Sequence, residues 1–171
     1  MIHAVVDDLN FLPSDAVVCP ATARLDPTTP VVRRLSQLGG PAFTAQLRVH
    51  SELAIGAAVV TAGGGDLPAE FVIHAVIQSD QEPVTRRGVE VAWRSALQRA
   101  QEWEFARLTA PPLGTGAGNL SVEDAAEIMV AVLSERSGTA AFPREVWLVV
   151  ETAEEREVFA AALRRTRGDA A

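Results

Sequence analysis

The chain has 171 residues, of which 48% are hydrophobic and 22% charged, and its formal net charge at pH 7 is −7. This composition predicts one folded domain over residues 1–171 and excludes a mostly disordered chain. The negative charge argues against a nucleic-acid or membrane-surface partner, and a single cysteine, Cys19, excludes an intrachain disulfide and a cysteine-based zinc site.

The N-terminus lacks a basic region followed by a long apolar segment, so a cytoplasmic location is expected. Apolar runs and helical periodicity then predict alternating strands and helices. In chain order we expect strands at Ile2–Val6 and Asp15–Cys19 (ended by Pro20), helical segments at Pro30–Leu38 and Ala42–Ser51, strands at Ala57–Thr61 and Phe71–Ile77, a helix at Pro83–Trp103, a strand at Phe105–Ala110, a helix at Val122–Glu135, a strand at Glu145–Val150, a helix from the Thr152–Glu155 capping box to about Arg165, and a frayed tail over about 166–171.

This alternation has no composition break, repeat or linker. It predicts an α/β fold, a three-layer α/β/α sandwich with helices on both faces of a central mixed, mostly parallel sheet. In such sheets a ligand binds outside the carboxyl ends of the strands. Three segments are expected to converge at that edge: Asp7-Asp8, Pro20–Arg24 and Pro111–Leu120.

The segment from Pro111 to Asp124 reads PPLGTGAGNLSVED and lies between a predicted strand and a predicted helix. Its alternate glycines let backbone amides approach a ligand closely, and the helix, capped by Ser121, directs its first N–H groups at the same place. We therefore expect an anion site, with a simple connecting turn as the alternative. A Walker loop is excluded because the chain has no lysine, and the dinucleotide pattern G-x-G-x-x-G is not matched.

His74 lies among valine and isoleucine inside the predicted strand Phe71–Ile77. No nucleophile or second ligand stands near it at a recognisable spacing, so we expect a core histidine with a satisfied ring nitrogen. The residues therefore predict no catalytic group, no metal site and no cofactor.

Four segments resemble the macrodomain family of ADP-ribose-binding, Appr-1″-p processing-like α/β/α modules, and the resemblance extends over nearly the whole chain, from Asp7 to about Leu163. Asp8-Leu9 resembles the Gly-Asp-Ile/Leu turn of the family, whose Asp takes the adenine amino group. Ala16–Leu25 (AVVCPATARL) is similar to A-[IV]-V-N-A-A-N-x-x-L. Thr61–Val76 (TAGGGDLPAEFVIHAV) is similar to T-x-G-x-x-L-P-x-x-[FY]-V-I-H-x-V, and Pro112–Ala125 resembles the phosphate loop with its helix.

The chain departs from this pattern at one end of the implied site. Cys19 and Thr22 stand where the family has asparagines, the second of which positions the distal ribose and is associated with hydrolysis. Asp26-Pro27-Thr28-Thr29-Pro30 replaces the triple-glycine catalytic loop, and two prolines there remove N–H donors. Gly118 stands where many members have an aromatic residue over the distal ribose. The resemblance thus implies a retained phosphate loop and a degraded hydrolytic loop.

Taken together, the resemblance implies a protein that binds ADP-ribose or a related nucleotide diphosphate, or an ADP-ribosylated protein, without efficient hydrolysis. The expected ligand-binding residues are Asp8, Leu9, Ala21, Thr22, Gly114, Thr115, Gly116, Ala117, Gly118, Asn119 and Leu120. One alternative is a hydrolase of ADP-ribosyl or O-acetyl-ADP-ribose bonds with an atypical site. The other is a vestigial pocket in a protein-interaction module. If the distal end is degraded, ADP and ADP-ribose should bind within about tenfold of each other.

Overall fold

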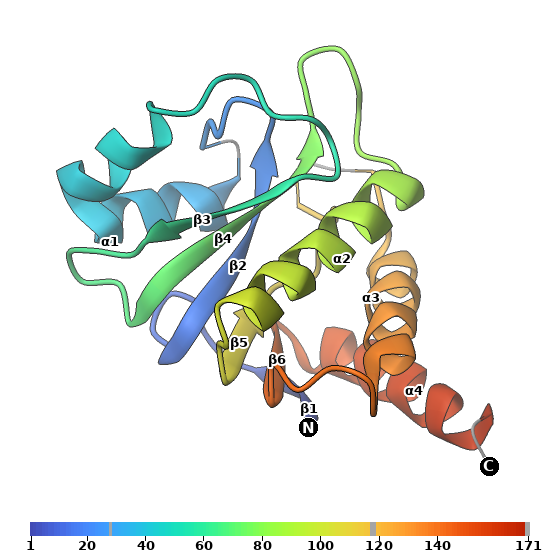
Figure 1. Ribbon diagram of the computed structural model, residues 1–171. Coiled ribbons are helices and arrows are strands. Elements are labelled where there is room, and N and C mark those ends of the chain that lie inside the picture. The colour runs from blue at the N-terminus through green and yellow to red at the C-terminus, as the bar shows by residue number, and fades with distance from the viewer. Residues whose placement is uncertain (28, 117–118, 170–171) are drawn as a thin grey trace.

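The computed structural model describes residues 1–27, 29–116 and 119–169 (Figure 1). Its elements in chain order are β1 Ile2–Val6, β2 Ser14–Thr22, α1 Pro30–Leu47, β3 Ala58–Ala62, β4 Ala69–Gln78, α2 Arg86–Glu102, β5 Arg107–Ala110, α3 Val122–Arg136, β6 Glu145–Val150 and α4 Ala153–Asp169. None of the described helices combines the length and the apolarity that a membrane crossing requires.

The strands form one sheet in the order β1-β6-β5-β2-β4-β3. Every neighbouring pair is parallel except β3 and β4, which run antiparallel. α1 lies on one side of the sheet, and α2 and α3 cover the other (Figure 1). This confirms the predicted three-layer sandwich with a mixed, mostly parallel sheet.

Alternate residues of β2 belong to two different apolar clusters, as expected for a strand buried on both faces. Ala16 and Val18 join the large cluster that contains core residues of α2, α3 and α4. Val17 and Cys19 join a smaller cluster with core residues of α1. Because both faces are covered, the ligand-accessible part of the sheet is its edge, where the strands end.

Several predicted boundaries were wrong, among them the ends of β2, α1 and α4. β2 does not end at Cys19 but continues through Pro20 to Thr22. β2 pairs with β5 at Ala16 and Val17, whereas it pairs with β4 as far as Thr22. Pro20 therefore lies beyond the residues of β2 that pair with β5, where the missing N–H of a proline is tolerated.

The other two of these errors concern helix ends. The predicted break at Gly39-Gly40 is confirmed by a non-helical Gly40 (φ 73°), but the following segment ends at Leu47 rather than Ser51. α4 continues to Asp169 instead of ending near Arg165, so the predicted fraying does not begin at residue 166. Ala170 and Ala171 lie outside the described residues.

Candidate functional site

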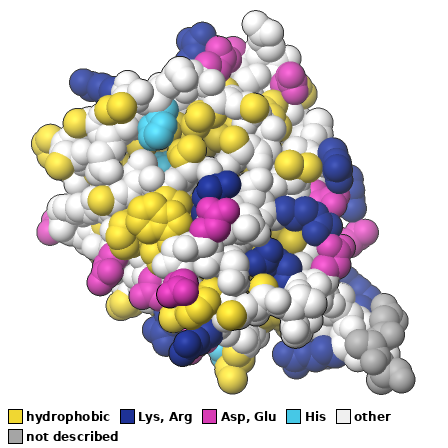
Figure 2. All heavy atoms as spheres, viewed as in Figure 1, with side chains coloured by type: hydrophobic (Ala, Val, Ile, Leu, Met, Phe, Trp, Pro, Cys, Tyr) yellow, Lys and Arg dark blue, Asp and Glu magenta, His cyan; other side chains and the backbone are white. Residues whose placement is uncertain are grey.

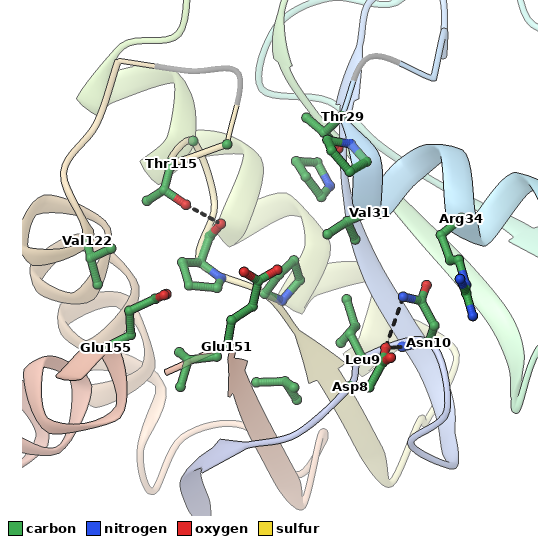
Figure 3. A pocket seen from close by; sticks show the side chains of 18 of the residues that line it. Asp8, Leu9, Asn10, Thr29, Val31, Arg34, Thr115, Val122, Glu151 and Glu155 are labelled. Atoms are coloured by element: carbon green, nitrogen blue, oxygen red, sulfur yellow. Dashed lines mark hydrogen bonds between the residues drawn. The ribbon is translucent and has the colours of Figure 1, made fainter. Parts of the chain in front are cut away.

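A cavity of about 930 Å³ opens at the carboxyl-end edge of the sheet (Figure 3). The ends of β1, β2, β4, β5 and β6 all contribute to its lining, through Val6 to Asp8, Pro20, Ile77 and Gln78, Pro111 and Pro112, and Val149 to Glu151. The three segments that we expected to converge each supply at least one of these residues. The cavity therefore lies where parallel α/β sheets place their ligands.

Asp8 lies in a tight turn directly after β1. One of its carboxylate oxygens, Oδ1, accepts from the backbone N–H of Asn10 at 2.9 Å and from the Asn10 side-chain amide at 3.0 Å. The Asp8 backbone N–H in turn donates to Asp7 Oδ1 at 2.7 Å. Leu9, 7% exposed, anchors the turn in the core. These contacts hold the Asp8 carboxylate at the cavity wall, with Oδ2 left to accept from a ligand.

The glycine-rich segment after β5 forms a second wall. Gly114 has a φ of 86°, a left-handed conformation that favours glycine, and its carbonyl accepts from the Leu120 N–H at 3.3 Å. The Thr115 hydroxyl donates to the Pro112 carbonyl at 3.4 Å, which closes a turn. Gly114, Thr115 and Gly116 all line the cavity. Backbone therefore makes up this wall, as the sequence predicts for an anion site.

The N-terminus of α3 follows this loop. The Ser121 side chain accepts from the Asp124 N–H at 3.1 Å and so caps the helix, as predicted. Arg86, at the start of α2, pairs with Asp124 and lies 3.3 Å from Glu127. These pairs are exposed, and they place a positive charge beside two carboxylates near the start of α3.

The start of α1 supplies the facing wall through Thr29, Pro30, Val31 and Arg34. A Cβ added to Gly116 would lie 3.4 Å from Thr29 Cγ2, so this wall and the glycine loop approach within van der Waals contact. Among the described residues, Arg34 is the arginine that lines the cavity, and its guanidinium carbon lies 5.5 Å from the centre of the Phe11 ring. The sequence reasoning did not find Arg34, because the resemblance pointed to the lost glycine loop and not to the helix behind it.

The sequence reasoning also missed two glutamates that line the cavity after β6. Glu155 belongs to the predicted capping box: the Thr152 hydroxyl lies 3.4 Å from Glu155 Oε1 and accepts from the Glu155 N–H at 3.2 Å. Glu151 has no hydrogen bond or ion pair within residues 1–27, 29–116 and 119–169. The rule that selected the loops after the other strands applies equally to β6 and would have selected Glu151.

Four predicted site residues do not line this cavity. Ala21 is buried, at 4% exposure, and the Thr22 hydroxyl oxygen accepts from the Asp26 N–H at 3.0 Å. Asn119 is exposed and Leu120 is half-buried behind Gly114. Their roles as ligand contacts stay predictions. Ala117 and Gly118 lie outside the described residues.

The region behind Ala21 is almost filled. A second cavity there has a volume of only about 10 Å³, at the lower limit of what one bound water needs, and Cys19 and His74 both line it. Burial raises the pKa of the Cys19 thiol to about 12, and burial, with a smaller contribution from His50, lowers the pKa of His74 to about 4. His74 Nε2 and Thr61 Oγ1 are 2.9 Å apart, which confirms the predicted core histidine.

At neutral pH, then, Cys19 is a protonated thiol and His74 a neutral imidazole. Neither lines the large cavity, so the pair offers no nucleophile or general base to a ligand there. Within the part of the chain that the structure describes, no cluster of His, Cys, Asp or Glu is arranged to hold a metal ion.

Comparison with known proteins gives one consistent picture. The model of the Macro domain family matches residues 18–129. An uncharacterised protein of Mycobacterium tuberculosis is 32% identical over 157 residues, covering 91% of this chain and 43% of the relative. An O-acetyl-ADP-ribose deacetylase of Salmonella gallinarum is 29% identical over 181 residues, covering 99% of this chain and 98% of that enzyme.

Among solved structures, a mutant Oceanobacillus iheyensis macrodomain with ADPR superposes with a TM-score of 0.82 at 20% identity, covering 96% of this chain and 92% of that one. At this identity the superposition establishes the fold alone. The chain spans less than half the length of the mycobacterial relatives that it matches.

Proposed function

The chain belongs to the macro domain family, and on this basis we propose that it binds ADP-ribose or a related nucleoside diphosphate without hydrolysing it efficiently. One observation carries the proposal: Asp8 and the Gly114–Gly116 backbone line the same large cavity at the carboxyl-end edge of the sheet. A hydrogen-bond acceptor at one wall and a glycine loop at another suit a ligand with an amino-bearing base and a diphosphate.

In this proposal Asp8 Oδ2 accepts from the adenine amino group, and the Asn10 donors keep the carboxylate in place. The amides of Gly114–Gly116 and the N-terminus of α3 hold the diphosphate. Neutral backbone dipoles are able to bind an anion in a protein of net charge −7 because they act at short range. The O. iheyensis macrodomain solved with ADPR has the same fold, which supports a ligand of this class.

The absence of efficient hydrolysis is argued from the groups at the positions of the two family asparagines. Cys19 is buried, and neither Cys19 nor Thr22 lines the large cavity; the Thr22 hydroxyl oxygen instead accepts from the Asp26 N–H. A bound ligand would therefore lack the contacts that position the distal ribose in the family pattern. Tight binding and slow turnover are the expected combination.

A second candidate is hydrolysis through other groups, favoured by the similarity to an enzyme named O-acetyl-ADP-ribose deacetylase over nearly the full length of both chains. Release of ADP-ribose from O-acetyl-ADP-ribose and from an ADP-ribosylated protein distinguishes the candidates. Turnover that disappears in Gly116→Glu would establish the hydrolase, whereas turnover that survives would indicate a contaminant.

Calorimetric titration with ADP-ribose tests the proposal. We expect saturable one-to-one binding and a rise in melting temperature with ligand concentration, since a ligand that binds the folded state stabilises it. No heat and no thermal shift at millimolar ADP-ribose would contradict the proposal.

A further inference from the structure

Glu151 places a carboxylate between the two regions to which the proposed function assigns the base and the diphosphate. It directly follows β6, lines the cavity and points into it, and in Figure 3 its carboxylate lies between Asp8 and Thr115. In a nucleoside diphosphate the group between base and diphosphate is the ribose. The order of groups along the cavity therefore matches the order along the ligand, with Glu151 at the sugar.

Each of the other carboxylates of the cavity has at least one oxygen in a hydrogen bond within the protein. Asp7 Oδ1 accepts from the Asp8 N–H, Asp8 Oδ1 accepts from Asn10, and Glu155 belongs to the capping box of α4. Glu151 makes no hydrogen bond or ion pair to any part of the chain that the structure describes. Both of its oxygens are thus available to donors on a ligand.

The negative charge of Glu151 opposes the binding of an anionic ligand. A free carboxylate near a bound diphosphate repels it, so Glu151 weakens binding unless the ligand presents donors to it. The ribose presents two, the 2′- and 3′-hydroxyl groups. A carboxylate that accepts from a hydroxyl forms a charge-assisted bond, which is stronger than one between neutral groups.

We propose that Glu151 is a specificity-determining residue that accepts hydrogen bonds from the 2′- and 3′-hydroxyl groups of the base-proximal ribose. This inference rests on the proposed function, since it needs the base at Asp8 and the diphosphate at Gly114–Gly116. It makes the cavity selective for ribonucleotides over their deoxy analogues. Acidic residues serve the same chemistry where they bind ribose in dinucleotide-binding folds.

The experiment measures the affinity of the full chain for ADP, 2′-deoxy-ADP and 3′-deoxy-ADP by calorimetry, in the wild type and in Glu151→Ala, Glu151→Gln and Glu154→Gln. The three nucleotides carry the same charge, so the ratio of their affinities cancels the repulsion that any lost carboxylate relieves. Glu154→Gln is the matched control, because it removes an exposed carboxylate from the same helix start without touching the cavity. A thermal melt of each variant checks that it is folded.

For the wild type we expect ADP to bind about tenfold more tightly than at least one deoxy analogue. That preference should fall to within about twofold in Glu151→Ala, take an intermediate value in Glu151→Gln and persist in Glu154→Gln. Equal affinity of the wild type for all three nucleotides, or a preference unchanged in Glu151→Ala, would overturn the assignment while leaving the proposed function intact. Binding of none of them, nor of ADP-ribose, would instead overturn the proposed function and this assignment with it.

Discussion

Two regions at the same edge of the sheet are built in opposite ways. Over the ends of β1, β2, β4, β5 and β6 there is an open cavity of about 930 Å³, whose lining includes Gly114–Gly116. Beside the end of β2, around Ala21, the remaining space is about 10 Å³ and is lined mostly by apolar side chains. Cys19, at the position of the first family asparagine, is buried and lines this second region, whereas Thr22, at the position of the second, accepts from the N–H of Asp26, which also lines it.

We therefore expect residues of the open cavity to determine ligand affinity and residues of the filled region to determine the stability of the fold. Asp8, Gly116 and Glu151 line the open cavity and are exposed, so they are free to contact a ligand. Side chains in the filled region make packing contacts and hydrogen bonds within the protein. Substituting them should therefore change the free energy of unfolding more than it changes the affinity for a ligand. Each prediction below tests one side of this separation, and they run from the largest expected effect to the smallest.

The largest effect on ligand binding is expected from Gly116→Glu. Gly116 is exposed and its backbone does not have a positive φ, so the substitution should fold normally. The new side chain would stand between the loop and Thr29 and bring a negative charge to the diphosphate position. We expect ADP-ribose affinity to fall by a hundredfold or more, about 2.7 kcal/mol, with unfolding free energy nearly unchanged. Gly168→Glu, in α4, is the charge-matched control. Equal affinity of the two variants for ADP-ribose would contradict the assignment of the diphosphate to the Gly114–Gly116 loop.

The filled region should show its effect in stability at acid pH, through His74. Its pKa is lowered from 6.5 to about 4 in the folded protein, so the unfolded chain binds the extra proton first. The contribution is fully present above pH 6.5 and is lost as the pH falls from 6.5 to about 4, a loss on the order of 2–4 kcal/mol.

His74→Gln removes this titration while keeping a polar group near Thr61. Urea unfolding at several pH values should show that the stability difference between wild type and His74→Gln shrinks or reverses as the pH falls through that range. His3→Gln, in β1, controls for loss of a histidine elsewhere. A difference that stays constant with pH would show that His74 does not titrate as a buried neutral group.

A smaller effect on binding is expected from Asp8→Ala. The change removes the acceptor assigned to the adenine amino group and also the Asn10 contacts that shape the turn. Affinity for ADP-ribose should fall by about tenfold to a hundredfold. Asp66→Ala removes an exposed carboxylate that does not line the cavity and should leave the affinity unchanged. Calorimetry on the three proteins decides, and similar affinities would place the base elsewhere.

Most of the fold was predictable because the local signals agree with one another. The strands carry apolar runs, Ser121 caps α3 as expected, and Gly40 interrupts α1 between the two predicted helical segments. The end of β2 was not predictable from Pro20, since a proline stops a strand only where its missing N–H would have a partner. Whether the N–H would have a partner depends on where β5 stops pairing with β2, and this is set by the tertiary structure and not by the local sequence.

The site was predictable in part. The rule that ligands lie beyond the strand ends located the cavity, and glycine spacing identified the loop at Gly114. Arg34 reaches the cavity from the side of α1, which no local pattern marks, and Glu151 was overlooked although the same rule covers β6. Thr22 appeared available in sequence because its bond to Asp26 exists only in the folded turn.

The central claim is that the open end of the site binds while the distal end no longer contributes, and one titration tests it directly. ADP and ADP-ribose share the base, the proximal ribose and the diphosphate and differ by the distal ribose. Measured on one sample at one salt concentration, their affinities should agree within about tenfold, or roughly 1.4 kcal/mol. A preference for ADP-ribose of a hundredfold or more would show that the protein still binds the distal ribose, and would contradict the claim that this end of the site no longer contributes.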